Sequence, residues 1–246
     1  MNPLRRHLPM PVPIDAGLTA AQLFLRAQAT WSARIVPRYE SFVLPCAATF
    51  LEARCFPGAD VEFIVRLSDG RTYAQIVAHG GSRPIPLMRG GHITGPDGAP
   101  LGFYRRWPAP DTPRASPPPG LAEDPLRTIA TVTAVDVAYR ITFAGNERID
   151  GADAAHLVLQ PVRDPAAYPL RDLWIARNNY EVVRLVYALP FKRSVALVTY
   201  DFAPVGEPPI WSIVHIAAST DGEAVSEELQ EIAFPTDAPR SYFDSP

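Results

Sequence analysis

Apolar and polar residues alternate along most of the chain, and this two-residue period predicts a β-rich protein. The clearest case is residues 61–67, where every second residue is a large apolar one (Val61, Phe63, Val65 and Leu67). Asp69-Gly70 follows, and this dipeptide favours the two-residue type I′ turn of a hairpin. The pattern therefore predicts a hairpin that pairs Leu67 with Thr72, Val65 with Ala74 and Phe63 with Ile76.

The second half of the chain also alternates. Residues 129–143 place Tyr139, Ile141 and Phe143 on one side of a predicted strand. Similar segments predict strands at 39–44, 85–88, 101–105, 155–160, 171–176, 181–188, 195–202, 210–218 and 225–234. Asp150-Gly151, Asn178-Asn179 and Asp221-Gly222 mark turns between them. Short connections of this kind indicate an antiparallel meander.

One segment, residues 18–33, has the composition of a helix that packs on a sheet. One side of the predicted helix carries Leu18, Ala21, Gln22, Leu25, Ala29 and Ser32, with Phe24, Ala27 and Trp31 close by. We predict a mainly β (α+β) fold, a strongly curved antiparallel sheet or half-open β-barrel with this N-terminal helix on its concave face. Residues 1–17 are expected to be loosely ordered, and 18–246 to form a single β-rich domain with a proline-rich loop at 107–120.

Composition excludes several classes of function. The net charge of -3 offers no footprint for nucleic acid. No apolar run reaches the roughly 18 residues that a membrane-spanning helix needs. The basic start of the chain is followed at 8–16 by three prolines and an aspartate, so no secretory signal is predicted there. Cys46 and Cys55 could close a small disulfide loop or remain two buried thiols, and both alternatives stay open.

Candidate catalytic chemistry is sparse. The sequence has no Gly-x-Ser-x-Gly nucleophile elbow, and no two histidines have a metal-binding spacing, so we predict no metal and no cofactor. The alternative is a hydrolase in which His79 or His92, which flank a Gly/Pro-rich loop, acts as the base. His156 and His215 fall within predicted strands, where hydrogen-bonded structural histidines are common.

The segment 157–175 is rich in paired charges and aromatic residues. Arg163 and Arg171, each followed by an aspartate, could form the rim of a binding site or hold a structural corner through hydrogen bonds. Trp174, at the centre of the next predicted strand, is expected to face an apolar interior.

These residues also resemble a known family. A strand ending Leu157-x-Leu159-x-Pro161, then Leu170-Arg171-Asp172-Leu173-Trp174-Ile175, a turn at Asn178-Asn179, and Tyr180–Arg184 are similar to the core of the periplasmic lipoprotein-sorting carrier superfamily. Phe234-Pro235 and Ser241-Tyr242-Phe243 resemble the way such chains end. The likeness is strongest over 129–190. Ala176 stands where the family usually has an aspartate.

The resemblance implies a half-open barrel, lidded by helices, that holds acyl chains without covalent chemistry. We therefore expect a non-enzymatic monomer that binds a lipid, acyl chain or acylated protein. Phe63, Val65, Leu67, Tyr139, Ile141, Phe143 and Trp174 would line the cavity. The family implies a periplasmic or extracellular location, and a cytoplasmic one is the alternative. A structural protein–protein interaction module in the cell envelope remains a further alternative.

Overall fold

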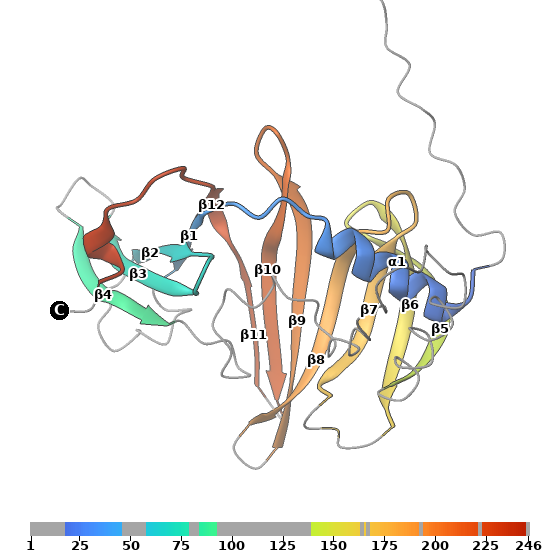
Figure 1. Cartoon of the computed structure of the whole chain (residues 1–246). Coiled ribbons are helices and arrows are strands. Elements are labelled where there is room, and N and C mark those ends of the chain that lie inside the picture. The colour runs from blue at the N-terminus through green and yellow to red at the C-terminus, as the bar shows by residue number, and fades with distance from the viewer. Residues whose placement is uncertain are drawn as a thin grey trace, which may run out of the picture.

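The computed structural model describes residues 18–45, 58–78, 84–92, 139–162, 165, 168–191, 194–220 and 223–244 (Figure 1). Within them, strands form two antiparallel sheets. The five-stranded sheet has the order β12-β1-β2-β3-β4 and the seven-stranded sheet the order β11-β10-β9-β8-β7-β6-β5. The helix α1 (Ala20–Ser32) lies across the seven-stranded sheet. The predicted β-rich fold with an N-terminal helix is confirmed, although the strands divide between two sheets.

The five-stranded sheet combines strands from residues 39–92 with one strand from residues 230–233. It contains β1 (Tyr39–Pro45), β2 (Ala59–Arg66), β3 (Arg71–Ala78), β4 (Ile85–His92) and β12 (Gln230–Ala233). The seven-stranded sheet is a meander in chain order. Its strands are β5 (Tyr139–Ile149), β6 (Ala152–Pro161), β7 (Leu170–Ala176), β8 (Val182–Phe191), β9 (Ser194–Val205), β10 (Ile210–Thr220) and β11 (Glu223–Glu228).

A capping box begins α1. The Thr19 hydroxyl accepts from the Gln22 backbone N–H at 3.2 Å, and the Gln22 side chain accepts from the Thr19 backbone N–H at 2.8 Å. Of the predicted side, Leu18 and Leu25 pack against the core, while Gln22, Ala29 and Ser32 are exposed. The buried side chains are Leu23, Phe24, Ala27 and Trp31. The larger side chains therefore determine which face of the helix docks on the sheet.

Two Asp-Gly pairs form different turns. At Asp150-Gly151 both residues have positive φ and Ile149 pairs with Ala152, which is a two-residue hairpin turn. At Asp69-Gly70 the loop spans four residues, and Val65 pairs with Thr72. The predicted hairpin forms, but its predicted register is wrong by two residues.

The reason for the longer loop lies in its side chains. The Asp69 carboxylate binds Arg66 through two hydrogen bonds of 2.9 and 2.6 Å and also accepts from the Arg71 backbone N–H. Leu67 is buried, and its backbone N–H donates to the Arg38 carbonyl at 3.0 Å. These contacts draw Leu67 out of the strand ladder while preserving which face each strand residue occupies.

The predicted strand at 225–234 becomes two strands in different sheets. The chain leaves β11 at Glu228 and enters β12 at Gln230, and Glu231 has φ of 50°. Between them, Leu229 packs against the apolar clusters of both sheets, and its backbone N–H donates to the Val214 carbonyl at 2.8 Å. Leu229 is thus the residue at which the chain passes from one sheet to the other.

The last described residues pack against one face of the five-stranded sheet. A short 3-10 turn, η4 (Arg240–Tyr242), brings Tyr242 against Tyr73 with ring centroids 3.8 Å apart. The neighbouring Phe243 is fully buried and stacks on Tyr39 at 5.4 Å. These stacked rings cover the side of the sheet that carries Tyr39 and Tyr73.

Candidate binding cleft at the junction of the two sheets

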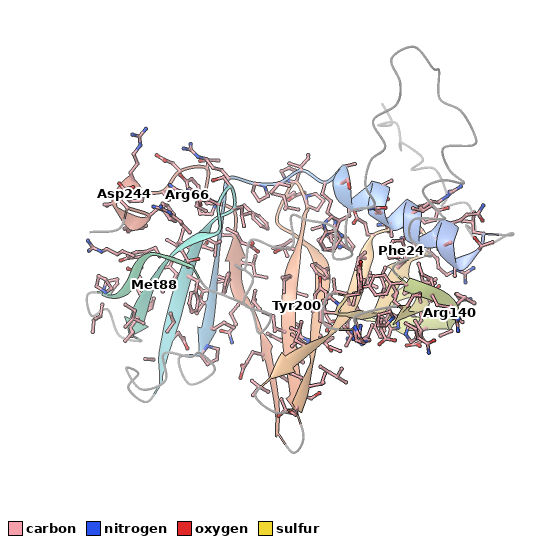
Figure 2. All side chains as sticks on the ribbon, turned by 60° about the horizontal axis from the view of Figure 1, so that its bottom comes forward. Phe24, Arg66, Met88, Arg140, Tyr200 and Asp244 are labelled. Carbon is pink, nitrogen blue, oxygen red and sulfur yellow. The ribbon has the colours of Figure 1, made fainter. Side chains whose placement is uncertain are left out.

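The interior beneath α1 is closely packed. Its buried cluster joins Phe24 and Trp31 of the helix to side chains from six strands of the seven-stranded sheet, β5 to β10. Of the predicted lining residues, Tyr139 is buried in this cluster and Ile141 packs against its edge. Phe143 follows on the same strand but is 46% exposed. Figure 2 labels Phe24 of α1 and Tyr200 of β9, two members of this cluster.

The other predicted lining residues lie elsewhere. Phe63, Val65 and Leu67 are buried in the cluster of the five-stranded sheet, so they do not share one cavity with Tyr139 and Ile141. Trp174 alternates along β7 with Leu173 and Ile175, which face α1, and so it lies on the opposite, outer face of the sheet. The predicted set is therefore divided among three surfaces.

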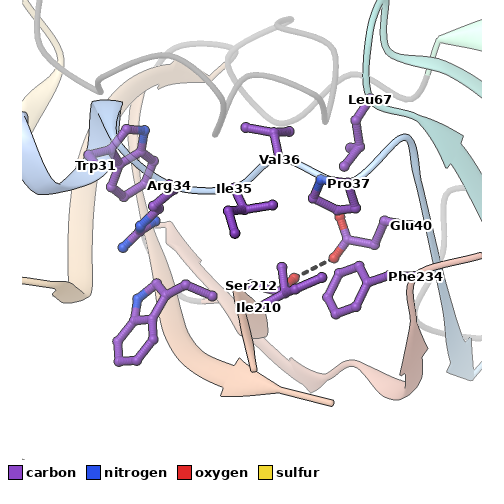
Figure 3. A pocket seen from close by; sticks show the side chains of 11 residues that line it. Trp31, Arg34, Ile35, Val36, Pro37, Glu40, Leu67, Ile210, Ser212 and Phe234 are labelled. Atoms are coloured by element: carbon purple, nitrogen blue, oxygen red, sulfur yellow. Dashed lines mark hydrogen bonds between the residues drawn. The ribbon is translucent and has the colours of Figure 1, made fainter. Parts of the chain in front are cut away.

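A small cleft lies where the two sheets meet (Figure 3). The α1–β1 connection forms one wall, and β10 forms another. Its free volume is about 30 Å³, and it is lined by Trp31, Arg34, Ile35, Val36, Pro37, Glu40, Leu67, Ile210, Trp211, Ser212 and Phe234. Leu67 is thus one predicted lining residue that borders this cleft. The lining is apolar except at Arg34, Glu40 and Ser212.

Glu40 is the most unusual residue of the cleft. It is only 1% exposed, although it carries a carboxyl group. One of its oxygens, Oε1, accepts a short hydrogen bond from the Ser212 hydroxyl, while Oε2 is buried with no hydrogen-bond partner in the structure. Burial raises the pKa of Glu40 to about 7, against the smaller opposing effect of the Ser212 hydrogen bond. Glu40 therefore changes charge near neutral pH.

Arg34 carries the opposite charge at the other end of the cleft. Its guanidinium donates to Glu181 Oε2 at 2.8 and 2.5 Å and lies 4.0 Å from the centre of the Trp31 ring. Burial lowers the pKa of Arg34, and the Glu181 carboxylate partly offsets this effect. This cation is therefore already paired and acts as part of the wall.

Two apolar side chains stand exposed at the mouth of the cleft. Ile35 is 84% exposed and Val36 is 44% exposed, and both belong to the connection between α1 and β1. Together they form a small exposed apolar surface beside the cleft.

The outer face of the seven-stranded sheet carries a row of polar side chains. His156 lies between Glu147 and Asp172 at 2.8 Å from each, and its ring stacks on Trp174. Further along the row, Arg184 binds Asp201 through both of its carboxylate oxygens. The expectation that His156 is a hydrogen-bonded structural histidine is confirmed.

The same row brings together Asp201, His215 and Ser226 from β9, β10 and β11. Asp201 contacts His215 Nδ1 at 2.7 Å, and His215 Nε2 contacts the Ser226 hydroxyl at 2.8 Å. This is the connectivity of a nucleophile, base and orienting acid. Asp201 is shared with Arg184, and Ser226 stands exposed on the sheet surface. The arrangement links three neighbouring strands, and His215 is hydrogen-bonded within its strand as expected.

The remaining predicted residues are placed as follows. Arg171 donates to the carbonyls of Tyr168, Leu170 and Pro165 at 2.6, 3.0 and 3.1 Å, so it holds the chain where it enters β7. Arg163, His79, Cys46, Cys55 and the 107–120 loop lie outside the described residues. His92 ends β4, and its side chain is likewise outside them.

Two features are absent from the described part of the chain. No group of three or more His, Cys, Asp or Glu side chains gathers there in a way that could hold a metal ion. No helix in those residues is long and apolar enough to cross a membrane.

Sequence reasoning overlooked Glu40, although a signal for it exists. In the predicted strand at 39–44, Glu40 shares its phase with Phe42 and Leu44. A carboxylate on the apolar side of an alternating strand is either at an edge or buried with a purpose, since burying a charge is costly. Ser212 could not be found in this way, because only the fold brings it to Glu40.

Comparisons with known proteins give likenesses of structure. No protein-family model matches the chain, and the curated proteins include no significant match. A LolA superfamily protein from Nitrosomonas europaea is 14% identical, with 93% of this chain and 99% of that chain covered and a TM-score of 0.37.

Two further structures are similar. A putative outer membrane lipoprotein-sorting protein domain from Vibrio parahaemolyticus is 12% identical, with 92% and 97% covered and a TM-score of 0.37. MucB in its complex with MucA, from Pseudomonas aeruginosa, gives 14% identity, 88% and 95% covered and a TM-score of 0.27. All three likenesses have low identity and low TM-scores. At such TM-scores, function has to be argued from the chain's own residues.

Proposed function

We propose that this protein binds an apolar ligand, such as a lipid or acyl chain, whose end enters the junction cleft. One observation carries this proposal. The cleft joins an apolar lining, two exposed apolar residues at its mouth and a buried carboxyl oxygen without a partner. Pockets for small molecules combine these features, an apolar wall with a few placed polar groups.

The cleft is a better candidate than the interior beneath α1. The described side chains beneath α1 are buried against one another, so a ligand that entered between the helix and the sheet would have to displace these contacts. Displacement of the helix would expose Phe24 and Trp31 to water. This exposure would cost about 2 kcal/mol or more of free energy for each side chain. In the cleft, the ligand would instead cover Ile35 and Val36, which are already exposed.

Binding would need no covalent step and no cofactor. Apolar contact stabilises the complex by about 25 cal/mol for each Å² removed from water, before the cost of association. The partner would be a free lipid or the acyl chain of another protein, and a periplasmic or extracellular setting would suit such a partner. We propose the monomer as the binding unit.

Tryptophan fluorescence can test the proposal, because Trp31 and Trp211 line the cleft. Titration with 1-decanol or decyl methyl ether should change the emission with saturation. An organic extract of the purified protein should also contain a bound lipid by mass spectrometry. Ile35→Asp with Val36→Asp should weaken binding by about tenfold or more, since charge at the mouth opposes apolar contact.

The matched control is Ile85→Asp. Ile85 is 51% exposed on β4, in the five-stranded sheet, and does not line the cleft. It should leave binding unchanged. A protein that shows no saturable response to either probe and yields no lipid does not have this function. An equal loss in both variants would mean that the probes bind without using the cleft.

A further inference from the structure

We infer that Glu40 receives the polar head of the ligand, and that this head is a hydrogen-bond donor of one or two heavy atoms, an ammonium or a hydroxyl group. The inference rests on the proposed function and names the class of ligand. Its basis is the geometry at the part of the cleft where Glu40 and Ser212 meet (Figure 3).

The two carboxyl oxygens of Glu40 differ in their surroundings. Glu40 Oε1 is satisfied by Ser212, while Oε2 is buried and has no partner. Leaving a buried polar atom unpaired costs about 1–3 kcal/mol, and more when the group is charged. Native proteins rarely retain such an atom unless water, an ion or a ligand completes it. Glu40 lines the cleft, so a small movement of its side chain would present this oxygen to a group that enters there.

The charge of the Glu40 carboxylate restricts the kind of head group that can bind there. An ionised carboxylate only accepts hydrogen bonds, so its partner must donate. Among the lining residues, Arg34 and Glu40 are the two that titrate, and the Arg34 guanidinium is already paired with Glu181. An anionic head would therefore meet the Glu40 charge without a free cation to offset it. An ammonium would form a charge-assisted bond there, and a hydroxyl would form a weaker one.

The size of the cleft restricts the head group further. The free volume of about 30 Å³ holds about two water-sized groups. An ammonium or a hydroxymethyl group matches this space more closely than a phosphate or a sugar does. The chain attached to the head would leave the cleft past Ile35 and Val36, which are exposed at its mouth. The polar and apolar parts of the site therefore match the two ends of a single-headed amphiphile.

Four ten-carbon probes separate these requirements: decylammonium, 1-decanol, decyl methyl ether and decanoate. At pH 8 the two donors should bind about tenfold or more tightly than the ether and decanoate, because only they complete Glu40. Tryptophan emission and calorimetry with the full chain both report the affinity. Equal binding of all four probes, or tightest binding of decanoate, overturns the inference while leaving the proposed function standing. Binding of none overturns the proposed function.

Variants distinguish the two donors and exclude a role for bound water alone. Glu40→Gln keeps an acceptor oxygen, so 1-decanol should bind it about as before, while decylammonium should bind about tenfold more weakly. Glu231→Gln, which removes an exposed carboxylate on β12, should change neither affinity. If Glu40→Gln leaves both affinities unchanged, the head does not reach Glu40, and water completes its oxygen.

Acidification supplies a second readout that a purely structural role would not change. Decylammonium stays protonated across neutral pH, while Glu40 loses its charge as the pH falls below about 7. The affinity for decylammonium should therefore fall several-fold between pH 8 and pH 6, and that for 1-decanol should change less. Ser212→Ala should preserve the order of the four probes, since it leaves Glu40 Oε2 in place. A reversed order in that variant contradicts the assignment.

Discussion

The interior beneath α1 and the junction cleft are both lined by apolar side chains. They differ in how completely these side chains are buried and their polar groups hydrogen-bonded. Beneath the helix, large side chains such as Phe24, Leu173 and Leu185 are almost entirely buried against one another. At the junction, Ile35 projects into water while Glu40 is buried with a free oxygen. The difference teaches that buried apolar area stabilises a fold, whereas incomplete satisfaction marks a place where something else can bind.

The largest expected effect tests the packed region. Phe24→Ala should lower the free energy of unfolding by about 3–5 kcal/mol, since it removes a buried aromatic ring and leaves a cavity. Urea unfolding followed by circular dichroism measures the change. Ser32→Ala, at an exposed position of the same helix, is the control. A loss below about 1 kcal/mol would show that α1 docks loosely, and the contrast with the cleft would disappear.

The next effect concerns pH at the junction. The pKa of Glu40 in the folded protein, about 7, lies above the ordinary value of 4.5. Ionised Glu40 is therefore disfavoured in the folded state. Its cost is absent below about pH 4.5, grows as the pH rises, and is complete above pH 7. At about 1.4 kcal/mol for each pH unit between the two pKa values, this cost is about 3 kcal/mol.

Glu40→Gln should consequently raise the free energy of unfolding by up to about 3 kcal/mol at pH 8 and change it little at pH 4. Denaturant titrations of the wild-type protein and the variant at both pH values measure the difference. A variant that is equally stabilised at both pH values would show that the gain does not come from the charge of Glu40.

The smallest effect on stability is expected at the mouth of the cleft. Ile35→Ser should change the free energy of unfolding by less than about 0.5 kcal/mol, because the side chain is 84% exposed. The same variant should weaken the binding of 1-decanol several-fold. If Ile35→Ser destabilised the fold as strongly as a core substitution, the mouth would be part of the packed interior and the comparison would fail.

Local patterns predicted much of this fold. The alternation at 61–67 predicted the β2–β3 hairpin, and Asp150-Gly151 predicted the turn that joins β5 to β6. What the patterns could not supply is long-range arrangement. Residues 225–234 show one uninterrupted strand pattern, yet tertiary packing of Leu229 between two clusters divides them between sheets. Likewise, contacts of Asp69 with Arg66 and Arg71 set a register that turn chemistry alone did not predict.

The candidate site was less accessible to sequence reasoning than the fold. Leu67 was predicted as a lining residue and does border the cleft, but Glu40, Arg34 and Ser212 were not singled out. Glu40 and Ser212 are 172 residues apart in sequence and meet only because β1 and β10 belong to adjoining sheets. The Asp201, His215 and Ser226 cluster escaped for a similar reason, since its members come from three successive strands.

The contacts of β12 and η4 with the five-stranded sheet have a consequence for how this molecule is made. The sheet begun at residue 39 acquires its edge strand from 230–233 and its ring stacks from Tyr242 and Phe243. During synthesis, the earliest strands therefore emerge well before their last partners exist. The sheet can be finished only after residues 230–243 have been made, so a deletion that removes them would damage what was translated first.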